Sequence, residues 1–239
     1  MCESCGCGDR SHATEDLGVL RDPIADRLRA QLVGHGVLAV RLLGAPRAGK
    51  TAVLAQTAQR LGGRRHLAAI TGALDAEHLR ATGMTAHVIE TGAACHLDAD
   101  RLARALAPLR IGALDLLFIE EIGDLICPAR HDLGQGANVV ALAVTDGVDT
   151  PLKYPWLFRR ADLVLLTKVD LASALGLDLG ALRDGVARVM PAPHVIEVSG
   201  ATGEGIDEWL TWLEARRPVA GHAVETLREP ELPGLLHPR

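Results

Sequence analysis

The chain has 239 residues, of which 48% are hydrophobic and 23% charged, so it is long enough to bury the core of one large domain. A formal net charge of −5 and few aromatic residues argue against a nucleic-acid partner, because such surfaces are basic and stack bases on aromatic rings. The sequence has neither an apolar run of the roughly 18 residues that a membrane span needs nor a secretory signal, which predicts a cytoplasmic protein without a membrane partner.

Residues 1–16 are rich in cysteine and lack hydrophobic periodicity, which predicts a flexible arm. Cys2, Cys5 and Cys7 lie in this arm, and an odd total of five cysteines in a reducing compartment argues against a disulfide framework. Three thiolates together with the N-terminal amine suit square-planar Ni(II) or tetrahedral Zn(II), and the chemistry leaves both open. A reactive arm without metal is the less favoured alternative, because cysteines at a chain terminus rarely serve packing.

Between residues 17 and 216, apolar runs alternate with amphipathic stretches. A helix is predicted first, over residues 17–35, and Pro23 within it marks either a break or the true start. Predicted strands follow at 37–43, 66–70, 86–90, 114–119, 139–145, 163–167 and 195–199. Predicted helices lie at 51–61, 75–82, 98–109, 179–189 and 205–215.

The apolar character of these strands indicates how they are arranged. Continuous apolar strands are typical of a parallel sheet that is covered on both faces. The pattern therefore predicts an α/β domain over residues 17–216, with a doubly wound, mostly parallel sheet and helices on both faces. Residues 217–239 are rich in proline and lack periodicity, which predicts a loosely ordered tail.

A phosphate-binding loop is predicted at residues 44–51, whose sequence Gly-Ala-Pro-Arg-Ala-Gly-Lys-Thr joins a predicted strand to a predicted helix. Backbone N–H groups of such a loop converge on phosphate oxygens, and the start of the helix adds partial positive charge. We expect Lys50 to reach the β- and γ-phosphates as a catalytic group, and Thr51 to ligate Mg²⁺. A chance glycine loop is disfavoured by the flanking strand and helix. The predicted cradle comprises Gly44, Ala45, Arg47, Ala48, Gly49, Lys50, Thr51 and Ala52.

Two later loops favour guanine over adenine as the base. Thr167, Lys168 and Asp170 form a Thr-Lys-x-Asp sequence that resembles the Asn-Lys-x-Asp motif of GTPases. The Asp170 carboxylate can accept two N–H groups from guanine, whereas threonine in place of asparagine loses one amide contact. Residues 199–201, Ser199, Gly200 and Ala201, resemble the Ser-Ala-Lys loop that closes over guanine. Each loop alone is a weak indication, but their order after the phosphate loop predicts GTP.

An acidic strand end is predicted beside the phosphates. Glu120 and Glu121 follow an apolar run, and Gly123 comes three positions after Glu120. This resembles the second acidic strand of phosphate-loop enzymes, in which a carboxylate holds the Mg²⁺ shell. Glu120 ends the strand and is the predicted catalytic residue, while Glu121 is interpreted as a solvated neighbour.

The two remaining cysteines are candidates for a second metal site. Cys95 is adjacent to His96, and adjacent residues cannot readily close a tetrahedral site, so a symmetric partner chain could supply the other ligands. Cys127 follows the acidic strand end, where nucleotide-sensitive loops lie in this kind of fold. A buried Cys127 that packs as a small apolar side chain is about equally favoured.

Together these residues resemble the HypB family, the nickel-incorporation GTPases of NiFe-hydrogenase maturation. The similarity extends to about residue 216 and is most specific at residues 95–100, Cys-His-Leu-Asp-Ala-Asp, and at residues 151–155, Pro-Leu-Lys-Tyr-Pro. It implies a phosphate-loop GTPase fold of the SIMIBI type and GTP hydrolysis coupled to nickel delivery into the hydrogenase large subunit. It further implies a GTP-dependent homodimer and a small zinc-containing partner that takes part in the delivery of nickel. Nickel is expected at Cys2, Cys5 and Cys7, and nickel or zinc at Cys95, His96 and Cys127.

One motif departs from the family pattern. Family members usually carry Glu-Gly-Asp after the second strand, whereas this chain has Thr-Gly-Ala-Leu-Asp at residues 71–75. Loss of that aspartate should weaken charge stabilisation at the transferring phosphoryl group. Either Asp75 takes its place as a catalytic residue, or hydrolysis is slow or absent. The alternative functions are a metal-storage or scaffold protein without useful hydrolysis, and a GTPase that serves another metalloenzyme such as urease.

Overall fold

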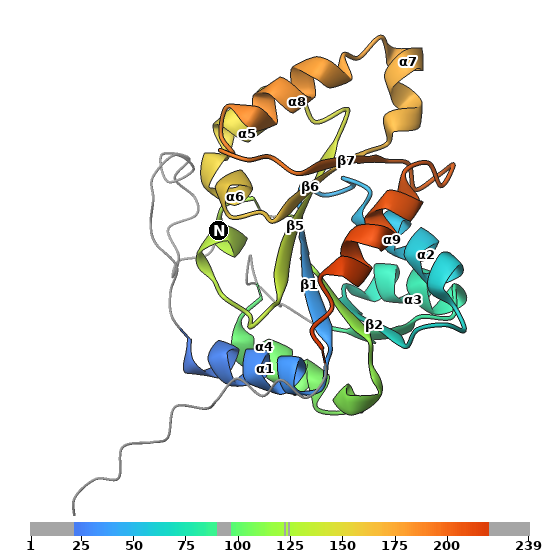
Figure 1. Ribbon diagram of the computed structural model, residues 1–239, viewed down its shortest axis with the longest axis vertical. Helices are drawn as coiled ribbons and strands as arrows, with labels where there is room; N and C mark the ends of the chain where they lie inside the picture. Colours follow the sequence, from blue (N-terminus) through green and yellow to red (C-terminus); the bar gives the residue numbers. More distant parts are fainter. Residues whose placement is uncertain (1–21, 90–96, 122, 124, 220–239) are drawn as a thin grey trace, which may run out of the picture.

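The computed structural model describes residues 22–89, 97–121, 123 and 125–219, which fold around one sheet of seven parallel strands (Figure 1). The strand order is β3-β2-β4-β1-β5-β6-β7. The strands are β1 (Leu38–Leu43), β2 (Leu67–Thr71), β3 (Thr85–Val88), β4 (Leu116–Glu120), β5 (Ala137–Ala143), β6 (Leu163–Thr167) and β7 (Val195–Val198). The predicted doubly wound α/β fold is confirmed, and every pairing in this sheet is parallel.

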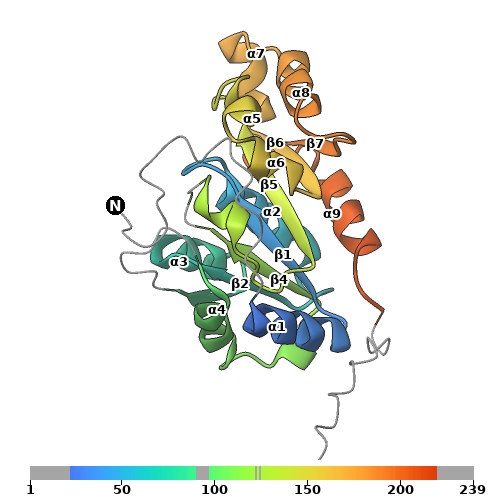
Figure 2. The same ribbon diagram turned by 90° about the vertical axis from the view of Figure 1, so that its left-hand side faces the viewer.

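Helices cover both faces of the sheet. One face packs against α2 (Lys50–Leu61), α3 (Ala73–Ala81) and α9 (Ile206–Ala215). The other face packs against α1 (Pro23–Gly34) and α4 (Ala99–Leu106), and farther along against α6 (Pro155–Arg159) and α8 (Leu179–Ala187). Figure 2 shows α5 (Thr150–Lys153), α7 (Ala172–Leu175) and α8 gathered at the end of the sheet that β6 and β7 form. Short 3-10 helices are η2 (Ile111–Ala113), η3 (Cys127–Arg130) and η4 (Val169–Leu171).

Alternation along β1 explains how the two hydrophobic layers form. Leu38, Val40 and Leu42 enter the core beneath α2, whereas Ala39 and Leu43 enter the opposite core. Arg41 lies on this second face and is 1% exposed, so a charged side chain separates two apolar clusters there. Such a charge is tolerated only with a partner, which is described below.

The strand order also predicts where a ligand binds. The chain proceeds from β1 outward to β2 and β3 on one side, and to β5, β6 and β7 on the other. In an open parallel sheet a crevice forms at such a reversal, outside the carboxyl ends of the strands. Here the reversal lies at the carboxyl end of β1, directly before the phosphate loop.

Several element boundaries differ from those predicted. Helix α1 begins at Pro23, which confirms the second of the two alternatives for that proline, because the Asp22 side chain accepts a hydrogen bond from the Ile24 N–H at 2.8 Å and caps the helix there. Helix α3 begins at residue 73, two positions earlier than predicted. Helices α5 and α6 were not predicted, because four or five residues beside prolines carry no measurable periodicity. No described helix has the length and apolar character that crossing a membrane requires.

Candidate functional site

The phosphate loop turns sharply between β1 and α2. Gly44 and Gly49 have φ values of 137° and 87°, and Arg47 has φ 62°. A Cβ atom on Gly44 would lie 2.3 Å from the Ala141 carbonyl oxygen, so only glycine fits beside β5. The Lys50 ammonium donates hydrogen bonds to the carbonyls of Gly44 and Ala45, each at 3.0 Å. Burial lowers the pKa of Lys50, although the nearby carboxylates of Glu120 and Asp75 oppose that shift.

Two carboxylates and two hydroxyls meet where α2 begins. The Thr51 hydroxyl lies 2.6 Å from Glu120 Oε1 and 3.2 Å from Asp75 Oδ1. The Thr71 hydroxyl donates to Glu120 Oε2 at 2.8 Å. Burial raises the pKa of Glu120, and these hydroxyl hydrogen bonds partly offset that effect. This set of hydroxyl and carboxylate oxygens fits Mg²⁺, which prefers oxygen ligands.

Asp75 reaches this cluster because α3 begins directly after β2. The helix places Asp75 in its first turn, where a carboxylate also interacts favourably with the helix dipole. Asp75, Thr51 and Glu120 line one cavity of about 430 Å³ together with the phosphate loop. The structure therefore brings the candidate replacement for the missing aspartate next to the predicted Mg²⁺ ligands.

The predicted base-recognition loop is joined to the phosphate loop. The Thr167 hydroxyl donates to the Ala48 carbonyl at 2.5 Å, and Thr167 is buried against Gly49. Lys168 then takes a left-handed conformation with φ 59°, which turns the chain into η4 and leaves Asp170 exposed. Thr167 thus joins two loops. The motif comparison predicted only that threonine loses an amide contact that asparagine makes, and it did not predict this hydrogen bond.

The Ser199 loop closes against the start of α2. The Ser199 hydroxyl accepts hydrogen bonds from the N–H groups of Ala201 and Thr202, at 3.2 and 3.1 Å. The Gln56 amide donates to the Gly200 carbonyl at 3.1 Å. A Cβ atom on Gly200 would lie 2.6 Å from the Ala52 Cβ, which explains why glycine replaces the more common alanine. Both base loops therefore contact the elements that form the phosphate cradle.

The sequence did not indicate a role for Asp146, nor the contact that Gly123 makes. Asp146 follows β5, and its carboxylate accepts the Ala143 N–H at 2.9 Å; burial raises the pKa of Asp146, which the hydrogen bond and nearby Lys168 and Lys50 oppose. The sequence signal that could have revealed Asp146 is its position shortly after the apolar strand β5, which pairs with β1. Gly123, with φ 104°, lies so close to the phosphate loop that a Cβ atom would be 2.8 Å from the Pro46 nitrogen. The segment after β4 therefore touches the phosphate loop.

Glu121 is buried and not a solvated neighbour, so that interpretation was wrong. Its Oε1 accepts hydrogen bonds from Arg41 Nε, at 2.8 Å, and from Arg41 Nη2. Arg41 Nη1 donates to the carbonyl of His131, the residue that follows η3. Glu121 Oε2 is buried without a described hydrogen-bond partner. The pair links β1, the acidic end of β4 and the segment after Cys127.

The predicted metal ligands are only partly within the described chain. Cys2, Cys5, Cys7, Cys95 and His96 lie outside the described residues, so their predicted roles stay predictions. Cys127 begins η3. Within the part of the chain that the structure describes, no three His, Cys, Asp or Glu side chains are grouped as a metal site.

Comparison with known proteins gives consistent matches. Residues 38–197 match the family model described as CobW/HypB/UreG, nucleotide-binding domain. The chain is 43% identical over 220 residues to hydrogenase maturation factor HypB of Azotobacter vinelandii, covering 90% of this chain and 73% of that protein. It is 41% identical over 218 residues to HypB of Escherichia coli K12, covering 89% and 75%.

Solved structures give the same result. The crystal structure of HypB from Archaeoglobus fulgidus has a TM-score of 0.74 at 37% identity, covering 80% of this chain and 96% of that one. HypB from Helicobacter pylori in complex with nickel has a TM-score of 0.76 at 27% identity, covering 81% and 93%. An LAO/AO transport system kinase, at 15% identity and a TM-score of 0.55, shares the fold.

Proposed function

The chain belongs to the HypB family of hydrogenase maturation factors, and from that premise we propose that it binds and hydrolyses GTP to deliver nickel into the large subunit of a NiFe-hydrogenase. The observation that carries the nucleotide part is the hydrogen bond from Thr167 to Ala48. It joins a loop suited to a base to a loop suited to phosphates, as one ligand with both groups requires. Asp170, three positions after Thr167, and the Ser199 loop, which contacts Gln56 and Ala52 of α2, favour guanine.

The residues of the cradle have distinct proposed roles. Backbone N–H groups of residues 44, 45 and 47–52 hold the phosphates, and Lys50 leaves its two carbonyl partners to bind phosphate oxygens. The oxygens of Thr51, Glu120 and Asp75 would hold Mg²⁺. When bound, Mg²⁺ neutralises charge that develops on the transferring phosphoryl group. Asp75 lies 3.2 Å from the Thr51 hydroxyl, which supports hydrolysis over a storage or scaffold role.

Nickel is proposed as the cargo. Cys2, Cys5 and Cys7 bind it in the N-terminal arm, and Cys95, His96 and Cys127 form a second site for nickel or zinc. The support is the thiolate-rich arm of this chain and the crystal structure of the Helicobacter pylori relative in complex with nickel. A GTP-dependent homodimer, a nickel-delivery partner protein and a cytoplasmic location complete the proposal.

Asp170→Asn tests base recognition. Xanthine carries a carbonyl oxygen where guanine carries its amino group, so an asparagine amide can donate to xanthine but cannot accept both guanine N–H groups. We expect the affinity for GTP to fall by about a hundredfold, and xanthosine triphosphate to become the tighter ligand. Equilibrium titration with labelled nucleotides measures both. Asp184→Asn on α8 is the matched control, and equal affinity of the unaltered protein for GTP and ATP would contradict the proposal.

Replacing Cys2, Cys5 and Cys7 together by alanine tests the nickel arm. We expect the tightest class of nickel sites to disappear, because the soft thiolate ligands are removed, while GTP affinity stays unchanged. Nickel titration with and without GTP gives both values. His12→Ala, in the same arm, is the control and should leave nickel binding intact. Unchanged nickel affinity in the triple variant would refute the assignment of this site.

A further inference from the structure

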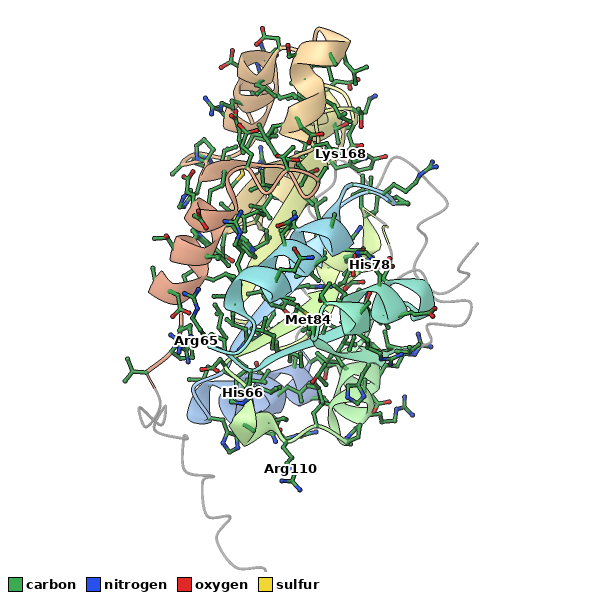
Figure 3. All side chains as sticks on the ribbon, turned by 90° about the vertical axis from the view of Figure 1, so that its right-hand side faces the viewer. Arg65, His66, His78, Met84, Arg110 and Lys168 are labelled. Carbon is green, nitrogen blue, oxygen red and sulfur yellow. The ribbon has the colours of Figure 1, made fainter. Side chains whose placement is uncertain are left out.

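A basic groove lies at the amino-terminal ends of the strands, on the opposite side of the sheet from the nucleotide loops, which follow the carboxyl ends. It has a volume of about 580 Å³ and is formed where β2, β3 and β4 begin. Figure 3 shows Arg65, His66 and Arg110 at this end of the domain, far from Lys168 at the opposite end. The basic residues of its wall are Arg64, Arg65, His66, His87 and Arg110.

The groove has unbalanced positive charge. No acidic side chain is among its lining residues. Arg64 and Arg110 are exposed, and neither forms an ion pair with a described residue. Arg65 is already paired, through Nε and Nη2, with the two carboxylate oxygens of Glu214 at 2.9 and 3.1 Å. Arg64 and Arg110 are therefore available for an acidic ligand.

The chain leaves the described domain beside this groove. Arg217 Nη2 donates to Asp115 Oδ1 at 2.6 Å, and Asp115 Oδ2 accepts the His66 N–H at 2.9 Å. Arg217 is thus tied, through Asp115, to a residue of the groove wall. The six residue-to-residue steps from Val219 to Glu225 can extend about 20 Å, so the following stretch can reach the groove.

We propose that residues 225–232 of this same chain dock in the basic groove. Their sequence, Glu-Thr-Leu-Arg-Glu-Pro-Glu-Leu, carries acidic side chains at Glu225, Glu229 and Glu231. The carboxylates pair with Arg64 and Arg110, and Leu227 and Leu232 pack on the apolar part of the wall, which includes Leu109 and Leu114. The tethering by Arg217 raises the effective concentration of the segment at the groove.

Hydrogen exchange of the full chain, followed by mass spectrometry, tests this docking. In the unaltered protein we expect protection of residues 62–67, 108–114 and 225–232. Replacing Glu225, Glu229 and Glu231 by glutamine should speed exchange of the two groove segments roughly fivefold, as loss of a few exposed ion pairs implies. Arg64→Gln with Arg110→Gln should speed exchange of residues 225–232 by a similar factor.

Matched variants separate docking from a general charge effect. Arg27→Gln with Arg188→Gln removes two exposed arginines elsewhere and should leave exchange unchanged. Arg64→Glu and Arg110→Glu combined with Glu225→Arg and Glu229→Arg should restore protection. If the exchange rates of residues 62–67 and 108–114 are the same in the unaltered protein and in the glutamine variant, the proposal is overturned. So would protection that is lost on dilution, because a second copy of the chain would then be the occupant.

Discussion

Arg41→Met should lower the free energy of unfolding by about 3–5 kcal/mol, since it leaves the Glu121 carboxylate buried without its counter-charge. Arg41 and Glu121 are 1% and 2% exposed, so water cannot replace the missing partner. The His131 carbonyl also loses the hydrogen bond from Arg41 Nη1. Urea unfolding of the nucleotide-free protein measures the change.

A double variant shows whether the cost comes from the unpaired charge. Arg41→Met combined with Glu121→Leu removes both charges and should recover most of the lost stability. Arg27→Met, an exposed arginine on α1, should change stability by less than about 0.5 kcal/mol. A loss below about 1 kcal/mol for Arg41→Met would mean that the pair is relaxed or hydrated in solution.

Asp75→Asn should lower the kcat for GTP hydrolysis by about a hundredfold, because it removes a negative charge from the predicted Mg²⁺ shell. The phosphate loop is unchanged in this variant, so GTP affinity should fall much less, while the Mg²⁺ concentration needed for half-maximal turnover should rise. Phosphate release measured across a Mg²⁺ series gives all of these values.

Glu77→Gln provides the control for Asp75. Glu77 lies on the same helix and is exposed, so its loss should leave turnover intact. If Asp75→Asn retains full turnover, Asp75 does not replace the missing aspartate of the family motif. If the unaltered protein releases no phosphate, the storage or scaffold function is favoured instead.

The sequence predicted the sheet well because the strands are nearly uninterrupted apolar runs. β6, for example, is buried at all five positions and was predicted with its observed limits. The phosphate loop and Glu120 could be predicted equally well, because each belongs to a local sequence motif at the end of a strand. The contact between Glu120 and Thr51 therefore follows from the strand order once β4 is known to neighbour β1.

The missed features depend on pairings between distant segments. Arg41 interrupts an apolar strand, and only the neighbouring position of β4 shows that Glu121 neutralises it. Thr167 differed from the expected asparagine, and its contact with Ala48 spans 119 positions of sequence. In each case the sequence shows an unusual residue at its position, but the residue that it contacts is determined by how distant segments pack in the sheet.

The hydrogen bond between Thr167 and Ala48 has a thermodynamic consequence. Because linkage is reciprocal, if occupation of the phosphate loop raises the affinity of the base loop for guanine through this contact, a bound guanine raises the affinity of the phosphate loop by the same factor. Base selectivity and phosphate affinity then become one cooperative property, so the binding free energies of two ligands that each offer one of the groups should sum to less than that of a ligand offering both.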